Sequence, residues 1–564
     1  MRADGDFAED AHVPPFQQSL HEGIIADVVA GEFFPGEILV RDGRIARVRP
    51  VASAPPGRVI VPGFVDAHVH VESSLLSPGF FGRHACVHGT AATVSDPHEI
   101  ANVLGVEGVQ WMLEDAKKSP VKIHFGAPSC IPATVFETAG ARFGVAQVEE
   151  LLARPEIKYL AEVMNYPGVI AREPGVMELV AVARRLGKPV DGHAPGLAGE
   201  ALRRYAGAGI ETDHECATLE GARERVALGM FVAIREGSAA RNFDALAPLL
   251  RESPERCFFC SDDKHPDDLL LGHINRLVAR AIASGAAPMD ALRAATLNPV
   301  RHYGLGTGLL QTGDPADFAV LTSLAEGRVL ENWIGGQMVA ADGRCLLPVP
   351  PAVASGAFPN NFSCTPRRPG DFAVEAPPAG KKIRVMVAED GQLTTGVEIV
   401  APTVRGGRIL ADPARDLLKI AVVNRYAEAP AAVGFIKNFG LKNSAIASSV
   451  AHDSHNIVAI GSDDEKLCAA VNAVIAHRGG LSGVHGDETL VLPLPIAGLM
   501  NPGACEEVGP AFTRLSEAAK AAGCPLRSPY MVLSFMALLV IPRLKIGDRG
   551  LFDATPFTPV PLVV

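Results

Sequence analysis

Between residues 61 and 311, the chain alternates between short apolar runs and longer segments in which apolar residues recur with helical spacing. Two of the helical segments are 174–187 and 196–209. Strand-like runs separated by helices predict βα units and a parallel sheet. These runs lie at 61–74, 89–97, 121–129, 157–166, 188–196, 209–218, 229–238 and 257–263. Eight such units over about 240 residues predict an α/β fold, a TIM-like (β/α)8 barrel over 61–311.

On both sides of this region the pattern changes to short β-like alternation. Residues 23–60 and 312–347 combine alternating apolar positions with turn signals such as RDGRI and ADGRC. A proline-rich, polar stretch then predicts a linker over 348–379. Residues 380–564 mix strand and helix patterns and predict a C-terminal α+β domain. Residues 1–22 are polar and without a pattern, and predict an N-terminal extension.

Composition narrows the class of protein and the compartment. The chain has 564 residues, enough for two or three domains, and 48% of them are hydrophobic. The net charge of −11 disfavours nucleic acid as a partner and favours a small neutral substrate. The most apolar window, 531–542, is shorter than the roughly 20 residues that cross a bilayer, so no membrane partner is expected. Ten unevenly spaced cysteines and no signal-peptide pattern predict a cytoplasmic protein.

The candidate chemistry begins with His68 and His70 at the end of the first strand-like run. Residues i and i+2 of a strand share a face, so both imidazoles can reach one metal ion. One histidine alone is more often a core residue that bonds the backbone. Four further strand-like runs, however, also end in a possible ligand: Glu162, His193, His214 and Asp262. Because the carboxyl ends of barrel strands meet at one mouth, the six residues predict a metal centre there.

Longer motifs surround these residues. They include PGFVDAHVH ending at His70, ATLNPVRHYGLGTGLLQTGDPADFAVL at 295–321, HVHVESSLLSP, TVSDPHEIANVLG, EVMNYPGVI, DGHAPGL, SDDKHPDDLL and a distal segment at 424–463. The first two motifs and the positions of the single histidines and the aspartate resemble the amidohydrolase superfamily. The others resemble, within it, the adenine deaminase family. The resemblance spans nearly the whole chain.

The resemblance implies a fold, a cofactor and an activity. Residues 23–60 and 312–347 are expected to form the discontinuous β-sandwich that flanks such barrels. Two divalent ions are expected, Mn²⁺ or Fe²⁺ before Zn²⁺: His68, His70, Glu162 and Asp262 around one, and Glu162, His193 and His214 around the other. Glu162 stands where related enzymes often carry a carboxylated lysine. The expected reaction is the hydrolytic deamination of adenine to hypoxanthine and ammonia in purine salvage, by a homo-oligomer, in the simplest case a dimer.

In this reaction Asp262 is expected to have two roles. Divalent ions lower the pKa of bound water from about 15.7 towards 7, which makes it a nucleophile at neutral pH. The leaving amine must then receive a proton, so an acid/base group is needed beside the nucleophile. Asp262 is expected both to bind metal and to move this proton.

Other polar residues at the strand ends are candidates for catalysis or substrate contact. Asp96 and His98 follow the second strand and either act in catalysis or brace the ligands. Glu72 either contacts substrate or braces the ligands. Arg235, Glu236 and Ser238 end the seventh strand and either contact the edge of the substrate or form a salt bridge at the rim. Whether His452 and His455 reach the site depends on how the C-terminal domain docks. Cys257 and Cys260 form a CxxC without a second pair, which favours a core role.

Two other classes of function remain open at this stage. A cyclic amide hydrolase of the hydantoinase or dihydroorotase kind would share the barrel and metals, but not the SDPHE and EVMNYPG segments. A metal-free scaffold protein would share the fold, but would be expected to lack some of the ligands.

Overall fold

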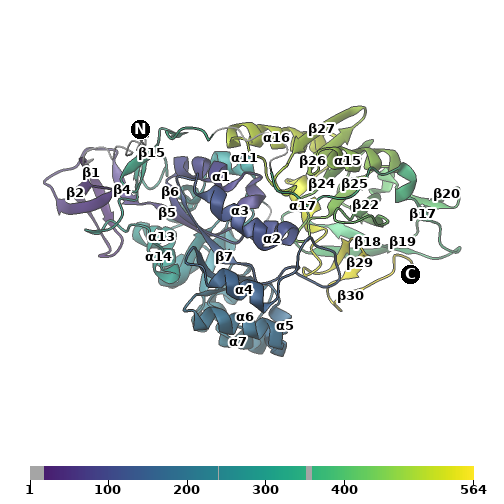
Figure 1. Ribbon diagram of the computed structural model, residues 1–564, viewed down its shortest axis with the longest axis horizontal. Coiled ribbons are helices and arrows are strands. Elements are labelled where there is room, and N and C mark those ends of the chain that lie inside the picture. Colours follow the sequence, from purple (N-terminus) through teal and green to yellow (C-terminus); the bar gives the residue numbers. More distant parts are fainter. Residues whose placement is uncertain (1–17, 239, 351–357) are drawn as a thin grey trace, which may run out of the picture.

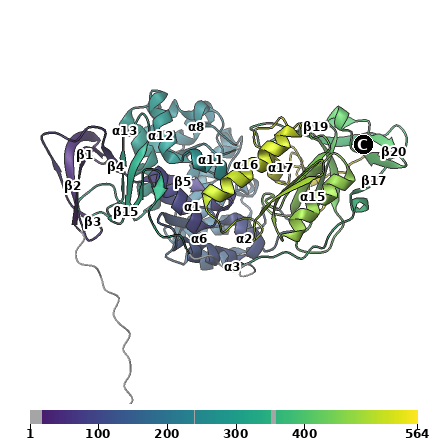
Figure 2. The same cartoon turned by 90° about the horizontal axis from the view of Figure 1, so that it is seen from above.

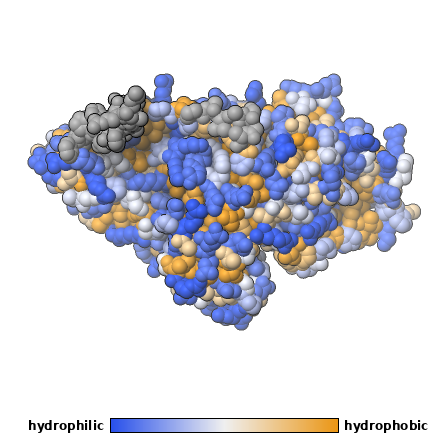
Figure 3. Space-filling view, viewed as in Figure 1, coloured by the Kyte–Doolittle hydropathy of each residue, from blue (hydrophilic) through white to orange (hydrophobic). Residues whose placement is uncertain are grey.

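The computed structural model describes residues 18–238, 240–350 and 358–564. Figure 1 shows three parts along the long axis: an N-terminal β-sheet, a central α/β barrel and a C-terminal α+β domain. Figure 2, seen from above, keeps the same order. On the face shown in Figure 3, hydrophilic side chains predominate and hydrophobic ones form scattered patches.

The central part is a barrel of eight parallel strands. They are β5 (Phe64–Val69), β6 (Thr90–Ser95), β7 (Lys122–Ala127), β8 (Ile157–Val163), β9 (Val190–Gly192), β10 (Thr212–Asp213), β11 (Phe231–Arg235) and β12 (Cys257–Cys260). Strands β5–β9 form one parallel sheet and β10–β12 another. A parallel bridge between Val69 and Asp262 joins β12 to β5, and Glu211 N donates to Val190 O at 2.9 Å between β9 and β10. The predicted (β/α)8 barrel is confirmed.

Helices surround the barrel strands. They are α1 (Pro78–Ala85), α2 (His98–Leu104), α3 (Val106–Ala116), α4 (Val145–Leu152), α5 (Tyr166–Ala171), α6 (Pro174–Arg185), α7 (Gly199–Gly207), α8 (Leu219–Ala227), α9 (Phe243–Leu246), α10 (Leu249–Glu252), α11 (Pro266–Leu271), α12 (Ile274–Ala283), α13 (Pro288–Ala295) and α14 (Leu297–Tyr303). The predicted helices at 174–187 and 196–209 correspond to α6 and α7. Alternate strand residues such as Val65, Ala67, Tyr159 and Ala161 fill the barrel interior. Because side chains fill the interior, an active site can form only at the mouth of the barrel.

The N-terminal sheet combines two distant parts of the sequence. Its eight strands run in the order β16 (Arg344–Cys345), β15 (Gln337–Ala341), β14 (Val329–Ile334), β13 (Phe318–Leu321), β4 (Val59–Pro62), β1 (Gln18–Asp27), β2 (Glu32–Arg41) and β3 (Arg44–Pro50). The sheet curls so that Ala316 N donates to Gly43 O at 2.9 Å and Gly336 N to Ala316 O at 3.0 Å. Its two halves enclose a core that includes Ile38 and Phe318. Strand β1 begins within the predicted extension 1–22, of which residues 1–17 lie outside the described residues.

The C-terminal domain is built on a second eight-stranded sheet. Its order is β19 (Thr395–Val400), β18 (Ile383–Ala388), β23 (Ala432–Lys437), β22 (Leu418–Val423), β25 (Ile457–Gly461), β24 (Ser444–Ser448), β26 (Gly480–His485) and β27 (Glu488–Pro493). The helices are α15 (Asp464–Ala476), α16 (Cys505–Ala521) and α17 (Pro529–Phe535). Two small sheets comprise β17 (Val374–Glu375), β20 (Thr403–Arg405) and β21 (Arg408–Leu410), and β28 (Leu544–Gly547), β29 (Gly550–Asp553) and β30 (Thr558–Pro559).

The predicted linker, 348–379, is partly packed against this domain. Phe362 and Phe372 are buried with residues of β22, β24 and α15. Residues 351–357 of the predicted linker lie outside the described residues. Within the described parts of the chain, no helix is both long and apolar enough to cross a membrane.

The C-terminal domain covers the mouth of the barrel. Asn501 N donates to Leu75 O at 2.7 Å, just after the short 3-10 helix that follows the first barrel strand. Asn456 Nδ2 donates to Thr138 O at 2.8 Å, and Thr138 N donates to Asp548 Oδ1 at 2.9 Å. The strand ends that carry the candidate ligands therefore face another domain and not open solvent.

Candidate metal centre

Three predicted ligands form a compact triangle at the junction of the first and last barrel strands. His68 Nε2 lies 3.2 Å from His70 Nε2, and Asp262 Oδ1 lies 3.5 Å and 3.3 Å from these two nitrogens. Atoms that bind one ion at about 2.0–2.2 Å lie about 3.0–3.6 Å apart. The backbone bonds that close the barrel hold Asp262 in this position, because Asp262 N donates to His68 O at 2.9 Å. The triangle has the dimensions of a metal site.

Glu162 lies between this triangle and a second group of imidazoles. Its Oε1 is 3.4 Å from His70 Nε2, and its Oε2 is 2.7 Å from His193 Nδ1 and 3.2 Å from His214 Nε2. The two oxygens of one carboxylate therefore face different histidines, as the carboxylate of a bridging ligand would. Burial opposes ionisation of Glu162, but His193 and His214 outweigh it and hold its pKa well below the usual range.

Glu215 joins the second group, and the sequence interpretation missed it. Its Oε1 lies 3.5 Å from His214 Nε2 and 3.8 Å from His193 Nδ1. Strand β10 ends at Asp213, so the alternation of a strand no longer applies to residues 214 and 215. A carboxylate directly after a candidate ligand at a strand end was the only signal available.

A buried arginine holds the carboxylates of both groups. Arg235 Nη1 donates to Glu215 Oε1 at 2.5 Å and to Asp262 Oδ2 at 2.7 Å. Its side chain is only 7% exposed. Burial raises the pKa of Asp262, but Arg235 together with His68 and His70 holds it well below the usual range. Arg235, which is also a predicted substrate contact, thus helps to keep Glu215 and Asp262 ionised.

Asp96 and His98 lie beside the two groups. His98 Nδ1 is 2.9 Å from Asp96 Oδ2 and 3.5 Å from Glu162 Oε1, while the backbone carbonyl of Asp96 lies 3.1 Å from His70 Nδ1. Asp96 thus orients two imidazoles, as residues behind metal ligands commonly do. The imidazole of His98 lines the pocket.

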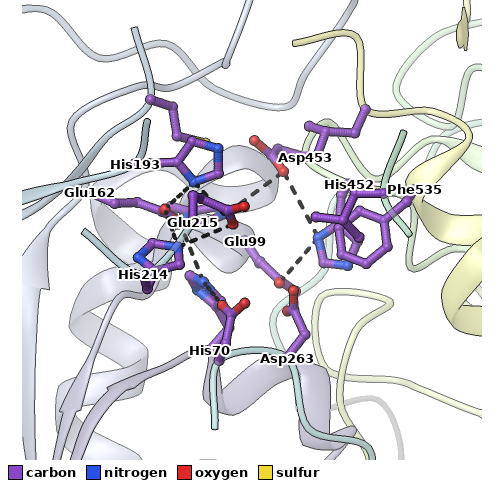
Figure 4. A pocket seen from close by; sticks show the side chains of 15 residues that line it. His70, Glu99, Glu162, His193, His214, Glu215, Asp263, His452, Asp453 and Phe535 are labelled. Atoms are coloured by element: carbon purple, nitrogen blue, oxygen red, sulfur yellow. Dashed lines mark hydrogen bonds and ion pairs between the residues drawn. The ribbon is translucent and has the colours of Figure 1, made fainter. Parts of the chain in front are cut away.

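The opposite wall of the pocket comes from the C-terminal domain. Figure 4 shows His452, Asp453 and Phe535 facing Glu162, His193 and His214. His98 Nε2 lies 3.8 Å from Asp453 Oδ1. The side-chain rings of His452 and Phe535 are stacked, with centroids 4.5 Å apart and an angle of 11° between their planes. The sequence left open whether His452 reaches the site, and the structure shows that it lines the pocket.

A polar edge of the pocket links the two domains. His452 Nδ1 lies 3.3 Å from Glu99 Oε1, and the Ser73 hydroxyl donates to Asp263 Oδ1 at 2.5 Å while its oxygen lies 3.1 Å from Glu99 Oε1. Glu99 Oε2 and His452 Nε2 are buried without a hydrogen-bond partner among the described residues. Buried polar atoms of this kind are normally satisfied, so these two are available to a ligand.

Above this edge lies an apolar roof, made of Leu393, Phe535 and Leu538. Leu393 comes from the connection between β18 and β19, and Leu538 follows α17. Met164, after β8, is the apolar residue of the barrel that lines the pocket with them. The pocket is therefore polar on the side of the candidate metal ligands and apolar on the side of the roof.

Several other predicted residues lie outside the pocket. Glu72 accepts a hydrogen bond from Ile100 N at 3.2 Å, and burial raises its pKa to about 7. Arg280 donates to Glu236 at 2.7 Å, and the Ser238 hydroxyl donates to Asp268 at 2.7 Å. Contact of these three residues with substrate stays a prediction from the sequence.

The remaining sequence candidates are buried away from the pocket. His455 lies behind His452, with Nε2 4.0 Å from Glu99 Oε2. Cys257 and Cys260 are fully buried in β12, where Cys257 belongs to the core under the helices and Cys260 to the barrel interior.

The fold and the ligand positions define the class of protein, an amidohydrolase-type hydrolase. Residues 59–339 match the amidohydrolase family, and residues 392–558 match the adenine deaminase C-terminal domain. The adenine deaminase of Methanosarcina mazei is 48% identical over 95% of this chain and 98% of its own length; that of Salinibacter ruber is 51% identical over 95% and 97%. The chain belongs to the adenine deaminase family.

Solved structures give lower similarity. β-Aspartyl dipeptidase from Fervidobacterium islandicum AW-1 is 12% identical, with a TM-score of 0.44 over 59% of this chain and 99% of that one. Adenosine deaminase from Xanthomonas campestris is 17% identical, with a TM-score of 0.43 over 58% and 94%. The family assignment does not depend on either.

The ion pairs of Arg235 give a stability prediction. Replacing Arg235 by Met leaves Glu215 and Asp262 buried without their cation, and we expect a loss of about 3–5 kcal/mol in the free energy of unfolding. Arg280 offers a matched control, because it also bonds two carboxylates, Glu236 and Asp244, but is 38% exposed. Arg280→Met should cost about 1 kcal/mol. Urea denaturation in the presence of a chelator measures both; equal losses would contradict this role of Arg235.

Proposed function

We propose that this chain catalyses the hydrolytic deamination of adenine to hypoxanthine and ammonia, a reaction of purine salvage. The observation that carries the proposal is the buried Glu162 carboxylate between two groups of imidazoles, under a roof supplied by the C-terminal domain of the adenine deaminase family. The geometry supports hydrolysis at a metal centre. The family supports adenine as the substrate.

The cofactor in this proposal is a pair of divalent ions, Mn²⁺ or Fe²⁺, with Zn²⁺ as a further candidate. The site fits them, because it offers only nitrogen and oxygen donors at distances suited to metal ligands. His68, His70, Glu162 and Asp262 would hold one ion, and Glu162, His193 and His214 the other. Bound ions supply the Lewis acidity that makes water a nucleophile at neutral pH.

Asp262 is assigned the proton transfer. Arg235 keeps its carboxylate ionised, so it is ready to accept the proton of the attacking water. It can then pass that proton on to the leaving amine. His98, held by Asp96, is the next candidate for acid/base work, because its imidazole also faces the pocket.

The rest of the pocket suits a planar heteroaromatic substrate. Adenine has apolar faces and an edge of ring nitrogens and an amine. The roof can cover its faces, while the free atoms of Glu99 and His452 can bond its edge. The preference for the free base over a nucleoside rests on the family.

Neither alternative function gains support from an observation on this chain. A cyclic amide hydrolase would not explain the C-terminal residues in the site. A scaffold protein would not explain why all six ligand positions converge. A homodimer and a cytoplasmic location remain predictions from the sequence.

The first test is metal content. We expect about two ions per chain in fully active protein, measured by elemental analysis, because Glu162 faces two ligand groups. Bicarbonate should not affect reconstitution of the metal-free protein, because a glutamate needs no carbon dioxide to act as the bridge. One ion per chain at full activity, or a clear bicarbonate requirement, would show that Glu162 is misassigned.

The second test is the reaction itself. Purified protein reconstituted with Mn²⁺ or Fe²⁺ should release ammonia from adenine, with hypoxanthine as the product, and should turn over adenosine, hydantoin and dihydroorotate poorly. Chelation should abolish the activity and added metal should restore it. Turnover of adenosine with adenine untouched would refute the assignment of substrate.

The third test separates proton transfer from metal binding. Asp262→Asn keeps an oxygen that can bind metal but cannot move a proton, so activity should fall about 10²–10⁴-fold while most of the metal is retained. Elemental analysis and steady-state kinetics on the same sample measure both. If the variant keeps its metal and more than about a tenth of wild-type turnover, Asp262 does not transfer the proton.

A further inference from the structure

We propose that Lys545 is a positioning residue that fixes the apolar roof over the substrate pocket, and so controls substrate binding without touching the substrate. The role rests on the proposed function of the pocket. Lys545 lies in β28, and its ammonium nitrogen donates to Leu393 O at 2.6 Å and to Phe535 O at 2.9 Å. Both acceptors belong to the roof.

These two hydrogen bonds matter because they compensate for the burial of the Lys545 amine. The side chain is 0% exposed, and no carboxylate lies within ion-pair distance of it in the described part of the chain. An amine buried without a counter-ion is costly unless all its donors are used. Burial lowers the pKa of Lys545 to about 7. The neutral amine has two N–H donors and the ammonium three, so either form can bond both carbonyls.

The two acceptors come from distant parts of the sequence. Leu393 precedes Lys545 by 152 residues, whereas Phe535, at the end of α17, precedes it by only 10. Their side chains pack in one apolar cluster with Met531, Leu538 and Ile541. Lys545 therefore links the two separate segments of the roof, the β18–β19 connection and the end of α17, by a hydrogen bond to each.

The position of Leu393 shows what the tie controls. Leu393 lines the substrate pocket and also a second, neighbouring cavity, whose lining includes Pro195, Cys216 and Gln392. Leu393 and Glu215 are the residues common to both. The β18–β19 connection is thus the wall between the two spaces. Without the bond to its carbonyl, this wall can shift towards the neighbouring cavity and loosen its contact with substrate.

Lys419 provides a matched control within the same domain. It is also buried, and its ammonium also donates to a backbone carbonyl, Phe372 O at 2.9 Å, besides the carboxylate of Asp464. Its partners lie away from the pocket lining. Lys419→Met should therefore lower stability while leaving the KM for adenine unchanged.

The test compares steady-state kinetics of Lys545→Met, Lys545→Arg and Lys419→Met. Lys545→Met keeps the volume of the side chain but has no donor, so both hydrogen bonds are lost, and we expect the KM for adenine to rise about tenfold. The value of kcat should stay within about threefold, because the metal ligands are untouched, and metal content should be unchanged. Lys545→Arg, which keeps several donors, should recover most of the loss in KM.

Three results would overturn the proposal: an unchanged KM in Lys545→Met, a fall in kcat alone, or an equal rise in KM in Lys419→Met. If Lys545→Met does not fold, Lys545→Gln replaces it under the same criteria, since its side chain is one bond shorter and its amide cannot reach both carbonyls. Equilibrium binding of adenine, measured in parallel, applies the same comparison without turnover. A wild type that binds adenine but does not deaminate it would count against the proposed function only, because the binding comparison still tests Lys545.

Discussion

The carboxylate of Glu162 is the group on which the arrangement of the barrel mouth depends. It is buried, and its two oxygens lie within 3.5 Å of four histidines, each of which follows the end of a different barrel strand. A buried carboxylate is tolerated only when cations or donors surround it. The imidazoles in turn lie close to each other, with His68 Nε2 3.2 Å from His70 Nε2, as ligands of one metal ion do. The ligand groups are therefore one electrostatic unit. Arg235 extends this unit to Glu215 and Asp262.

The C-terminal domain has a different task from the barrel. The barrel supplies rigid strand ends, which place charged groups with the accuracy that metal chemistry needs. The C-terminal domain supplies His452, Asp453 and the roof, which close the site against solvent. Exclusion of water strengthens every electrostatic interaction inside. The two domains meet through Glu99 and His452, so the polar edge of the pocket forms only when the domains are docked.

Much of the fold and of the ligand set follows from short-range rules. The period of the apolar residues predicts the eight barrel strands, and the place of His68, His70, Glu162, His193, His214 and Asp262 at strand ends predicts that they converge, as the structure places them. Glu215 was missed because it lies just past a strand, where side chains no longer alternate. Asp453 and the roof could not be found, because their approach depends on how a distant domain docks. For Glu236 and Ser238 the sequence left substrate contact and a rim salt bridge open, and the structure shows Glu236 bonded to Arg280 and Ser238 to Asp268.

The central claim, that Glu162 bridges two metal ions, is tested most directly by anomalous X-ray diffraction from crystals of the Mn²⁺-loaded protein. We predict two anomalous peaks, both in contact with Glu162: one bounded by His68, His70 and Asp262, the other by His193 and His214. A single peak at full occupancy, or a pair of peaks of which one does not contact Glu162, would contradict the account.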